Sequence, residues 1–181
     1  MDRTAAPHAG GKTYNHTTTF KTAWDKVAQA LWKRYPNPYS QHVRSEDTIS
    51  RTVNEGKLVT KRLLTKTNRP PWWLEKFVAQ GSTACIIEES EVDAAAKTFK
   101  THTRNVSHSR LLSVEESCLY YVSPENNDWT CCEKQVWIKC GVRGFSRAVE
   151  KFSADRYKGN AHKAEMGLEF VINKLFPASS S

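Results

Sequence analysis

The sequence of 181 residues lacks the features that mark a membrane-spanning or a secreted disulfide-rich protein. It has no run of about 18 consecutive apolar residues, so we expect no membrane-spanning helix. No short apolar segment follows the N-terminus, so a secretory signal is not expected either. Since 39% of the residues are apolar, the chain is sufficient for one domain with a sizeable core.

Cysteine is sparse, and its spacing does not indicate a metal centre. The five cysteines, Cys85, Cys118, Cys131, Cys132 and Cys140, form no CxxC pair and no cluster with histidine at zinc-binding spacing. Their odd number does not fit a disulfide framework, so we expect small core or surface residues. The adjacent Cys131 and Cys132 would point to opposite faces of a strand. We therefore expect no metal ion, cofactor or disulfide.

Residue patterns typical of catalysis are also missing. The sequence shows no Ser/His/Asp arrangement and no paired carboxylates at a useful spacing. His42, His102 and His108 could supply a general base, but an ordinary surface histidine is the commoner explanation. We therefore expect a protein without enzymatic activity.

Positive charge is concentrated in the first half of the chain. Residues 1–80 contain 14 Lys/Arg and 6 Asp/Glu, whereas residues 81–181 contain 13 of each. Residues 57–76 alone hold six basic side chains against one acid. An anionic surface is the natural partner of such a segment, and both nucleic acid and anionic lipid headgroups satisfy that description.

Hydrophobic periodicity predicts an α+β domain. Residues 1–14 are expected to be a flexible lead-in, most of residues 1–19 to lie outside the fold, and residues 177–181 to be a disordered tail. The sequence TAWD at 22–25 has the form of a capping box, and apolar spacing continues the helix to Tyr35 with Arg34 in its last turn. A hairpin follows, with strands 47–53 and 57–66 joined by Asn-Glu-Gly.

Four further strands are expected at 83–92, 97–106, 110–122 and 129–140, followed by one long helix over about residues 143–176. The short connections favour antiparallel neighbours. We therefore expect a curved antiparallel sheet whose concave face is covered by the C-terminal helix, with a cavity between them.

The middle of this helix carries polar residues where apolar ones are expected. One stripe of about 80° contains Phe145, Val149, Phe152, Arg156, Asn160, Lys163, Gly167 and Phe170. Polar groups on a buried stripe need partners. An anionic headgroup in the cavity would satisfy them, but so would acids such as Asp155, Glu165 or Glu115, and the segment could also face water. The opposite face, with Ala154, Ala161 and Leu168, offers no better apolar stripe.

The segment after the hairpin combines aromatic and basic residues. Residues 68–82 contain Arg69, Pro70, Pro71, Trp72, Trp73 and Lys76. Interfacial tryptophans beside basic residues are typical of a loop that enters an anionic bilayer. We expect this segment to be a lid that docks on a membrane, the alternative being that both Trp rings lie in the core.

Four motifs resemble, in the same order, those of the PRELI family. They are RYPNPYSQHV at 34–43, RLLTKTNRPPWW at 62–73, TFKTHTRNVSH at 98–108 and GFSRAVEKF at 144–152. The resemblance covers roughly residues 15–176 and is nearer to the PRELI branch than to the slowmo branch. It implies a fold like that of START and phosphatidylinositol-transfer domains, with one lipid in an internal cavity.

The resemblance also implies a function. It implies transfer of phosphatidic acid between the outer and inner mitochondrial membranes, through the intermembrane space, in support of cardiolipin synthesis. A small helical-hairpin chaperone with twin CX9C motifs would be the partner, with transient contact to an anionic membrane and none to nucleic acid. The headgroup site implied falls on Arg34, Lys66, Arg156, Asn160 and Lys163. Phosphatidylserine transfer, or a basic RNA-binding module of a different class, remains an alternative.

Overall fold

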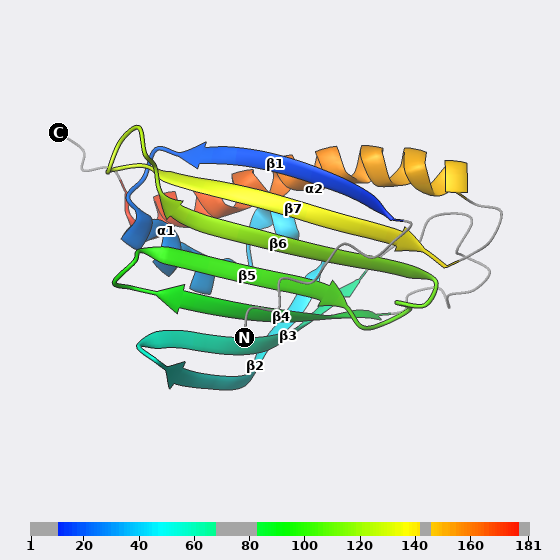
Figure 1. Cartoon of the computed structure of the whole chain (residues 1–181), viewed down its shortest axis with the longest axis horizontal. Coiled ribbons are helices and arrows are strands. Elements are labelled where there is room, and N and C mark those ends of the chain that lie inside the picture. The colour runs from blue at the N-terminus through cyan, green and yellow to red at the C-terminus, as the bar shows by residue number, and fades with distance from the viewer. Residues whose placement is uncertain (1–10, 68–82, 142–145, 178–181) are drawn as a thin grey trace.

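The computed structural model describes residues 11–67, 83–141 and 146–177, and the side chains of the last segment from Tyr157 onward except residue 158. The described residues form seven strands, two α-helices and one short 3-10 helix (Figure 1). In chain order these are β1 Lys12–Phe20, α1 Trp24–Trp32, η1 Pro38–Ser40, β2 Val43–Asn54, β3 Lys57–Thr67, β4 Thr83–Asp93, β5 Thr98–Asn105, β6 Leu112–Val122, β7 Thr130–Cys140 and α2 Ser146–Leu175.

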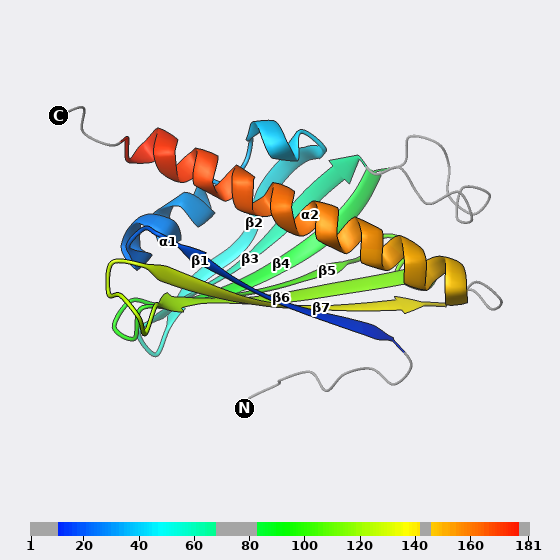
Figure 2. The same cartoon turned by 90° about the horizontal axis from the view of Figure 1, so that it is seen from above.

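The strands form one antiparallel sheet in the order β1-β7-β6-β5-β4-β3-β2. Strands β2 to β7 follow one another as a meander, as expected from their short connections. The sheet is curved, and α2 lies across one of its faces with α1 near the C-terminal end of α2 (Figure 2). The predicted α+β class, with a curved sheet around a long C-terminal helix, is therefore confirmed.

The N-terminal segment corrects one expectation. Residues 12–20 are strand β1, which pairs with β7 from Lys12 opposite Ile138 to Phe20 opposite Thr130. The prediction that most of residues 1–19 lie outside the fold is wrong for residues 12–19, and the domain begins before residue 15. The polar sequence of β1 did not indicate a strand, because this edge strand alternates partly buried and exposed side chains and buries only Phe20.

The β2–β3 hairpin agrees with its sequence signal. Gly56 has a φ of +78° and Glu55 a φ of +50°, so both turn residues are in the left-handed region that tight hairpins require. The two strands are longer than expected, because pairing continues to Val43 opposite Lys66. Lys66 lies one residue before the end of β3.

Helix α1 differs from its prediction at both ends. The N-cap residue is Ala23, which makes no side-chain cap, so the expected capping box at Thr22 is wrong. The carbonyl of Thr22 instead accepts a hydrogen bond of 2.7 Å from the Thr130 hydroxyl. The helix ends at Trp32, so Arg34 lies beyond its last turn.

The core lies at one end of the sheet, where α1 and the C-terminal half of α2 pack together. It contains Phe20, Trp24, Val27, Ala28, Ala30, Leu31, Phe99, Cys118, Tyr120, Cys132, Leu168, Val171 and Ile172. In the described part of α2, Ala161 and Leu168 are therefore on the buried face, whereas Asn160, Lys163 and Phe170 are exposed. The prediction that the stripe faces the core is wrong for Phe170, whereas Gly167 of the same stripe is buried. The small and aliphatic side chains of α2 meet the sheet, and Asn160 and Lys163 lie at the edge of that face.

Candidate functional site

A cavity of about 360 Å³ lies between the concave face of the sheet and the middle of α2. Apolar side chains form much of its wall: Phe20, Leu64, Ala84, Ile86, Leu112, Val114, Val136, Ile138, Ala161, Ala164 and Leu168. The site exists because the core fills only the end of the sheet beneath α1 and the C-terminal half of α2. The expected internal cavity is thus present.

Four of the five predicted headgroup residues line this one cavity. Arg34 reaches it from the segment after α1, Lys66 from the end of β3, and Asn160 and Lys163 from α2. The side chain of Arg156 and the whole of residues 68–82, including the predicted lid, lie outside the described residues. That these residues bind a headgroup stays a prediction.

Lys66 and Lys163 are two of the basic side chains that line the cavity. Among the described residues neither ammonium group has an ion-pair or hydrogen-bond partner. Two ammonium groups without a counter-charge beside a cavity attract an anion by direct electrostatic interaction. The cavity therefore has the electrostatics of an anion site beside an apolar volume.

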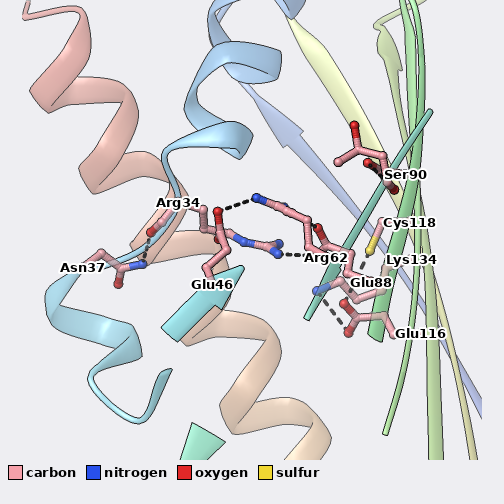
Figure 3. Close-up of polar contacts among 10 residues, drawn as sticks. Arg34, Asn37, Glu46, Arg62, Glu88, Ser90, Glu116, Cys118 and Lys134 are labelled. Atoms are coloured by element: carbon pink, nitrogen blue, oxygen red, sulfur yellow. Dashed lines mark hydrogen bonds and ion pairs between the residues drawn. The ribbon is translucent and has the colours of Figure 1, made fainter. Parts of the chain in front are cut away.

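Arg34, in contrast, is held by an acid that the sequence did not reveal. Its Nη2 donates a 2.7 Å hydrogen bond to Oε2 of Glu88, whose side chain is fully buried. Arg62 also donates to Glu88, and its Nη1 donates to Oε1 of Glu46 at 2.6 Å (Figure 3). A buried carboxylate therefore compensates the charge of Arg34. The burial of Glu88 was not predicted, because both faces of β4 carry acidic residues and the sequence alone does not show which face is buried.

The pKa values of Glu88 and Arg34 are shifted toward their charged forms, whereas burial raises the pKa of Glu46. Burial raises the pKa of Glu88, but Arg34 and Arg62 lower it by a larger amount, so its pKa lies below the ordinary value. Burial lowers the pKa of Arg34, but Tyr35 and Glu88 outweigh that effect and raise it. The Nε–H of Arg34 is buried without a partner among the described residues. Arg34 is thus charge-balanced by Glu88 and still keeps a donor to offer.

A second polar group lies on strands β6 and β7. Nζ of Lys134 is 3.7 Å from Oε2 of Glu116, and both side chains line the cavity. Burial lowers the pKa of Lys134, but Glu116 and the thiols of Cys118 and Cys132 raise it to a value above the ordinary one. Lys134 therefore remains an ammonium at neutral pH. Nothing in the sequence singled out this pair, since the pairing register of β6 and β7 brings it together.

Two contacts fasten α2 to the edge of the sheet. Oε1 of Glu165 accepts a 2.6 Å hydrogen bond from the Thr18 hydroxyl and lies 2.7 Å from Nε2 of His16. About two helical turns before Glu165, the ring of Tyr157 stacks on the ring of Tyr14, with the ring centroids 5.0 Å apart. Strand β1, unforeseen from the sequence, thus closes one side of the cavity.

The histidines and cysteines form no reactive centre in the described part of the chain. His42 and His108 line the cavity, whereas Nε2 of His102 lies 3.7 Å from Glu115. No group of three His, Cys, Asp or Glu suitable for a metal ion occurs among these residues. None of the five cysteines is in a disulfide, and the adjacent Cys131 and Cys132 are both buried. Within residues 11–67, 83–141 and 146–177, neither helix is long and apolar enough to cross a membrane.

The curved antiparallel sheet around a C-terminal helix, with a cavity between them, defines a START/Bet v1-like domain. The crystal structure of TTHA0849 from Thermus thermophilus is similar, with a TM-score of 0.60 and 14% identity over 91% of this chain and 99% of that one. The Zhui aromatase/cyclase of a Streptomyces strain has a TM-score of 0.58 at 12% identity, covering 94% of this chain and 99% of that one. These neighbours establish the fold alone.

Sequence comparison then gives the family. The profile of the PRELI-like family matches residues 25–178, and the chain belongs to that family. It is 44% identical over 158 residues to "PRELI domain-containing protein 1, mitochondrial" of Gallus gallus, covering 86% of this chain and 74% of the relative. It is 40% identical to "Protein UPS1, mitochondrial" of Saccharomyces cerevisiae, covering 90% and 93%. Identity to the "Protein slowmo homolog" of Dictyostelium discoideum is 29% over 87% of this chain and 69% of that relative.

Proposed function

We propose that this protein is a phospholipid-transfer protein of the mitochondrial intermembrane space that carries phosphatidic acid from the outer to the inner membrane and thereby supplies cardiolipin synthesis. One lipid molecule occupies the cavity between the sheet and α2. Membership of the PRELI-like family and the mitochondrial names of the relatives support the setting.

The observation that carries the proposal is the pairing of two cations with an apolar volume. Lys66 and Lys163 reach the cavity with ammonium groups that have no partners among the described residues, and aliphatic side chains form much of the remaining wall. Such ammonium groups can bind a phosphate monoester, and Arg34 and Asn160 can donate further hydrogen bonds to it. Each acyl CH₂ that enters the apolar part contributes about 0.8 kcal/mol.

The basic first half is better explained by this cavity than by an RNA surface. On β3, Lys57 and Lys61 form ion pairs with Glu91 and Glu89, and Arg62 is buried. These pairs neutralise the exposed lysines that a flat nucleic-acid surface would need. Among the described basic residues of β3, Lys66 lines the cavity.

The test is extraction of lipid from liposomes by purified protein. Lys66→Glu and Lys163→Glu should abolish extraction of phosphatidic acid while the circular dichroism spectrum is retained. Lys61→Glu on the outer face of β3 and Lys174→Glu on the exposed side of α2 are charge-matched controls that should extract normally. Normal extraction by both cavity variants would refute the proposal. Mass spectrometry of copurifying lipid would separate phosphatidic acid from phosphatidylserine.

A partner is part of the proposal. The family resemblance points to a small helical hairpin with twin CX9C motifs, and none of the five cysteines gives this chain a disulfide of its own. Coexpression with such a hairpin should raise the yield of soluble protein. A stable and active chain expressed alone would refute the requirement.

A further inference from the structure

Lys134 and Tyr157 present two unsatisfied hydrogen-bond donors to the same cavity. Lys134 lies on β7 opposite Cys118 of β6 and His16 of β1, and only 11% of its side chain is exposed. Tyr157 extends from α2 into the cavity, and its hydroxyl oxygen is buried without a hydrogen-bond partner among the described residues. A buried donor left without an acceptor is destabilising, so the Tyr157 hydroxyl calls for an acceptor on a ligand, and Lys134 can donate to the same ligand from the cavity wall.

The charge balance around Lys134 indicates that the ligand group bound here is uncharged. Its ammonium is paired with Glu116 at 3.7 Å, which is an ion-pair distance and too long for a hydrogen bond. No hydrogen bond from Nζ to a described residue is present. The pair is therefore neutral overall but has unfilled donors. A second anion here would be repelled by the Glu116 carboxylate, whereas a neutral acceptor would not.

The two donors lie beside the same stretch of β1, since Lys134 is in register with His16 and Tyr157 stacks on Tyr14, two residues earlier on that strand. Burial raises the pKa of the Tyr157 hydroxyl, the Lys134 ammonium lowers it and the Glu116 carboxylate raises it. The ring of Tyr157 is fixed by its stacking on Tyr14. Lys134 and Glu116 project from neighbouring strands on the face that also carries Glu88, as Figure 3 shows.

We propose that Lys134 and Tyr157 form an ester-carbonyl subsite, in which the ammonium and the phenol donate hydrogen bonds to the acyl ester carbonyls of a bound diacyl phospholipid. This inference rests on the proposed function and adds a chemical determinant to it. Ester carbonyls are the neutral acceptors nearest to the phosphate in such a lipid. A protein with this subsite distinguishes ester-linked from ether-linked chains, because an ether has no carbonyl.

The test compares two lipids of equal chain length, phosphatidic acid with two ester-linked chains and its dialkyl ether counterpart, each offered in phosphatidylcholine vesicles. The full chain should extract the ester about fivefold more than the ether, as expected from one or two hydrogen bonds. Lys134→Met and Tyr157→Phe should each reduce this ratio by lowering ester extraction alone. A general loss of structure would lower the extraction of both lipids equally.

Matched controls come from the outer face of the sheet. Lys139 lies on β7 and points to the opposite face from Lys134, and Tyr121 lies on the outer side of β6, where its hydroxyl donates to Glu133. The control variants are Lys139→Met and Tyr121→Phe. Both should keep the ester preference. Equal extraction of the two lipids by the wild type, or an unchanged ratio in Tyr157→Phe, would overturn the subsite. Extraction of neither lipid by the wild type would overturn the proposed function itself.

Discussion

Gly167 of α2 packs directly against the side chain of Asn37, so that a Cβ on Gly167 would lie 2.9 Å from Oδ1 of Asn37. Asn37 cannot easily give way, because its Nδ2 donates to the Arg34 carbonyl at 2.7 Å and its Oδ1 accepts from the Tyr39 amide at 2.9 Å. This contact sets the distance between α2 and the segment that carries Arg34.

Gly167→Ala should therefore lower the free energy of unfolding by about 1–3 kcal/mol, since overpacking forces the helix away from the loop. Gly159→Ala is the matched control on the same helix, where a Cβ meets nothing within 4 Å. Its better helix propensity should raise stability by up to about 1 kcal/mol. Urea unfolding of both variants measures the difference, and equal effects would contradict the packing described.

Replacing Glu88 should be among the most damaging changes in the sheet. Glu88→Gln leaves the guanidinium groups of Arg34 and Arg62 buried without their shared counter-charge, and should cost about 3–5 kcal/mol. Glu89→Gln, one residue further on the outer face, removes only a half-exposed pair with Lys61 and should cost less than about 1 kcal/mol. Urea unfolding compares the two variants. A small effect at residue 88 would mean that water replaces the carboxylate.

The contact of Glu165 with His16 and Thr18 should give a pH-dependent contribution to stability. Burial raises the pKa of Glu165, but the hydrogen bonds from Thr18 and His16 lower it, so the net value is below the ordinary 4.5. A lowered pKa means that the stabilisation is complete above pH 4.5 and is lost as the pH falls through the folded-state value. Below that value the carboxylic acid is neutral in both states.

The stability difference between wild type and Glu165→Gln should therefore be constant at neutral and weakly acidic pH and shrink below about pH 4.5. Urea unfolding across this range measures it, with Glu169→Gln, an exposed carboxylate on the same helix, as the reference. A difference that persists unchanged at about pH 3 would show that the carboxylate charge is not what fastens α2 to β1.

Filling the cavity should block lipid uptake. Ala164 lines the cavity from α2, and Ala164→Trp places a large ring where acyl chains are proposed to lie. Extraction of phosphatidic acid should fall by about an order of magnitude, because the ring excludes the chains. His162→Trp, two residues earlier on the exposed side, should extract normally. Equal extraction by both variants would place the lipid elsewhere.

Local patterns in the sequence were sufficient for most of the elements. Alternating apolar residues and Gly56 determined the hairpin, the short connections determined the antiparallel meander, and helical spacing determined the long C-terminal helix. The resemblance to the PRELI family added the START-like fold and the residues Arg34 and Lys66, whereas the polar stripe of the helix had already singled out Asn160 and Lys163. All four residues line one cavity. Each of these signals depends on residues close together in the chain.

The tertiary structure alone decided which groups meet. The burial of Glu88 between Arg34 and Arg62, the pairing of β1 with β7, and the approach of Lys134 to Glu116 depend on strand register and on contacts between distant segments. The rotation of α2, which buries Ala161 and Leu168 in place of the polar stripe, was also set by packing. Periodicity fixes which residues share a face of a helix, whereas the face that is buried depends on the surface against which the helix packs.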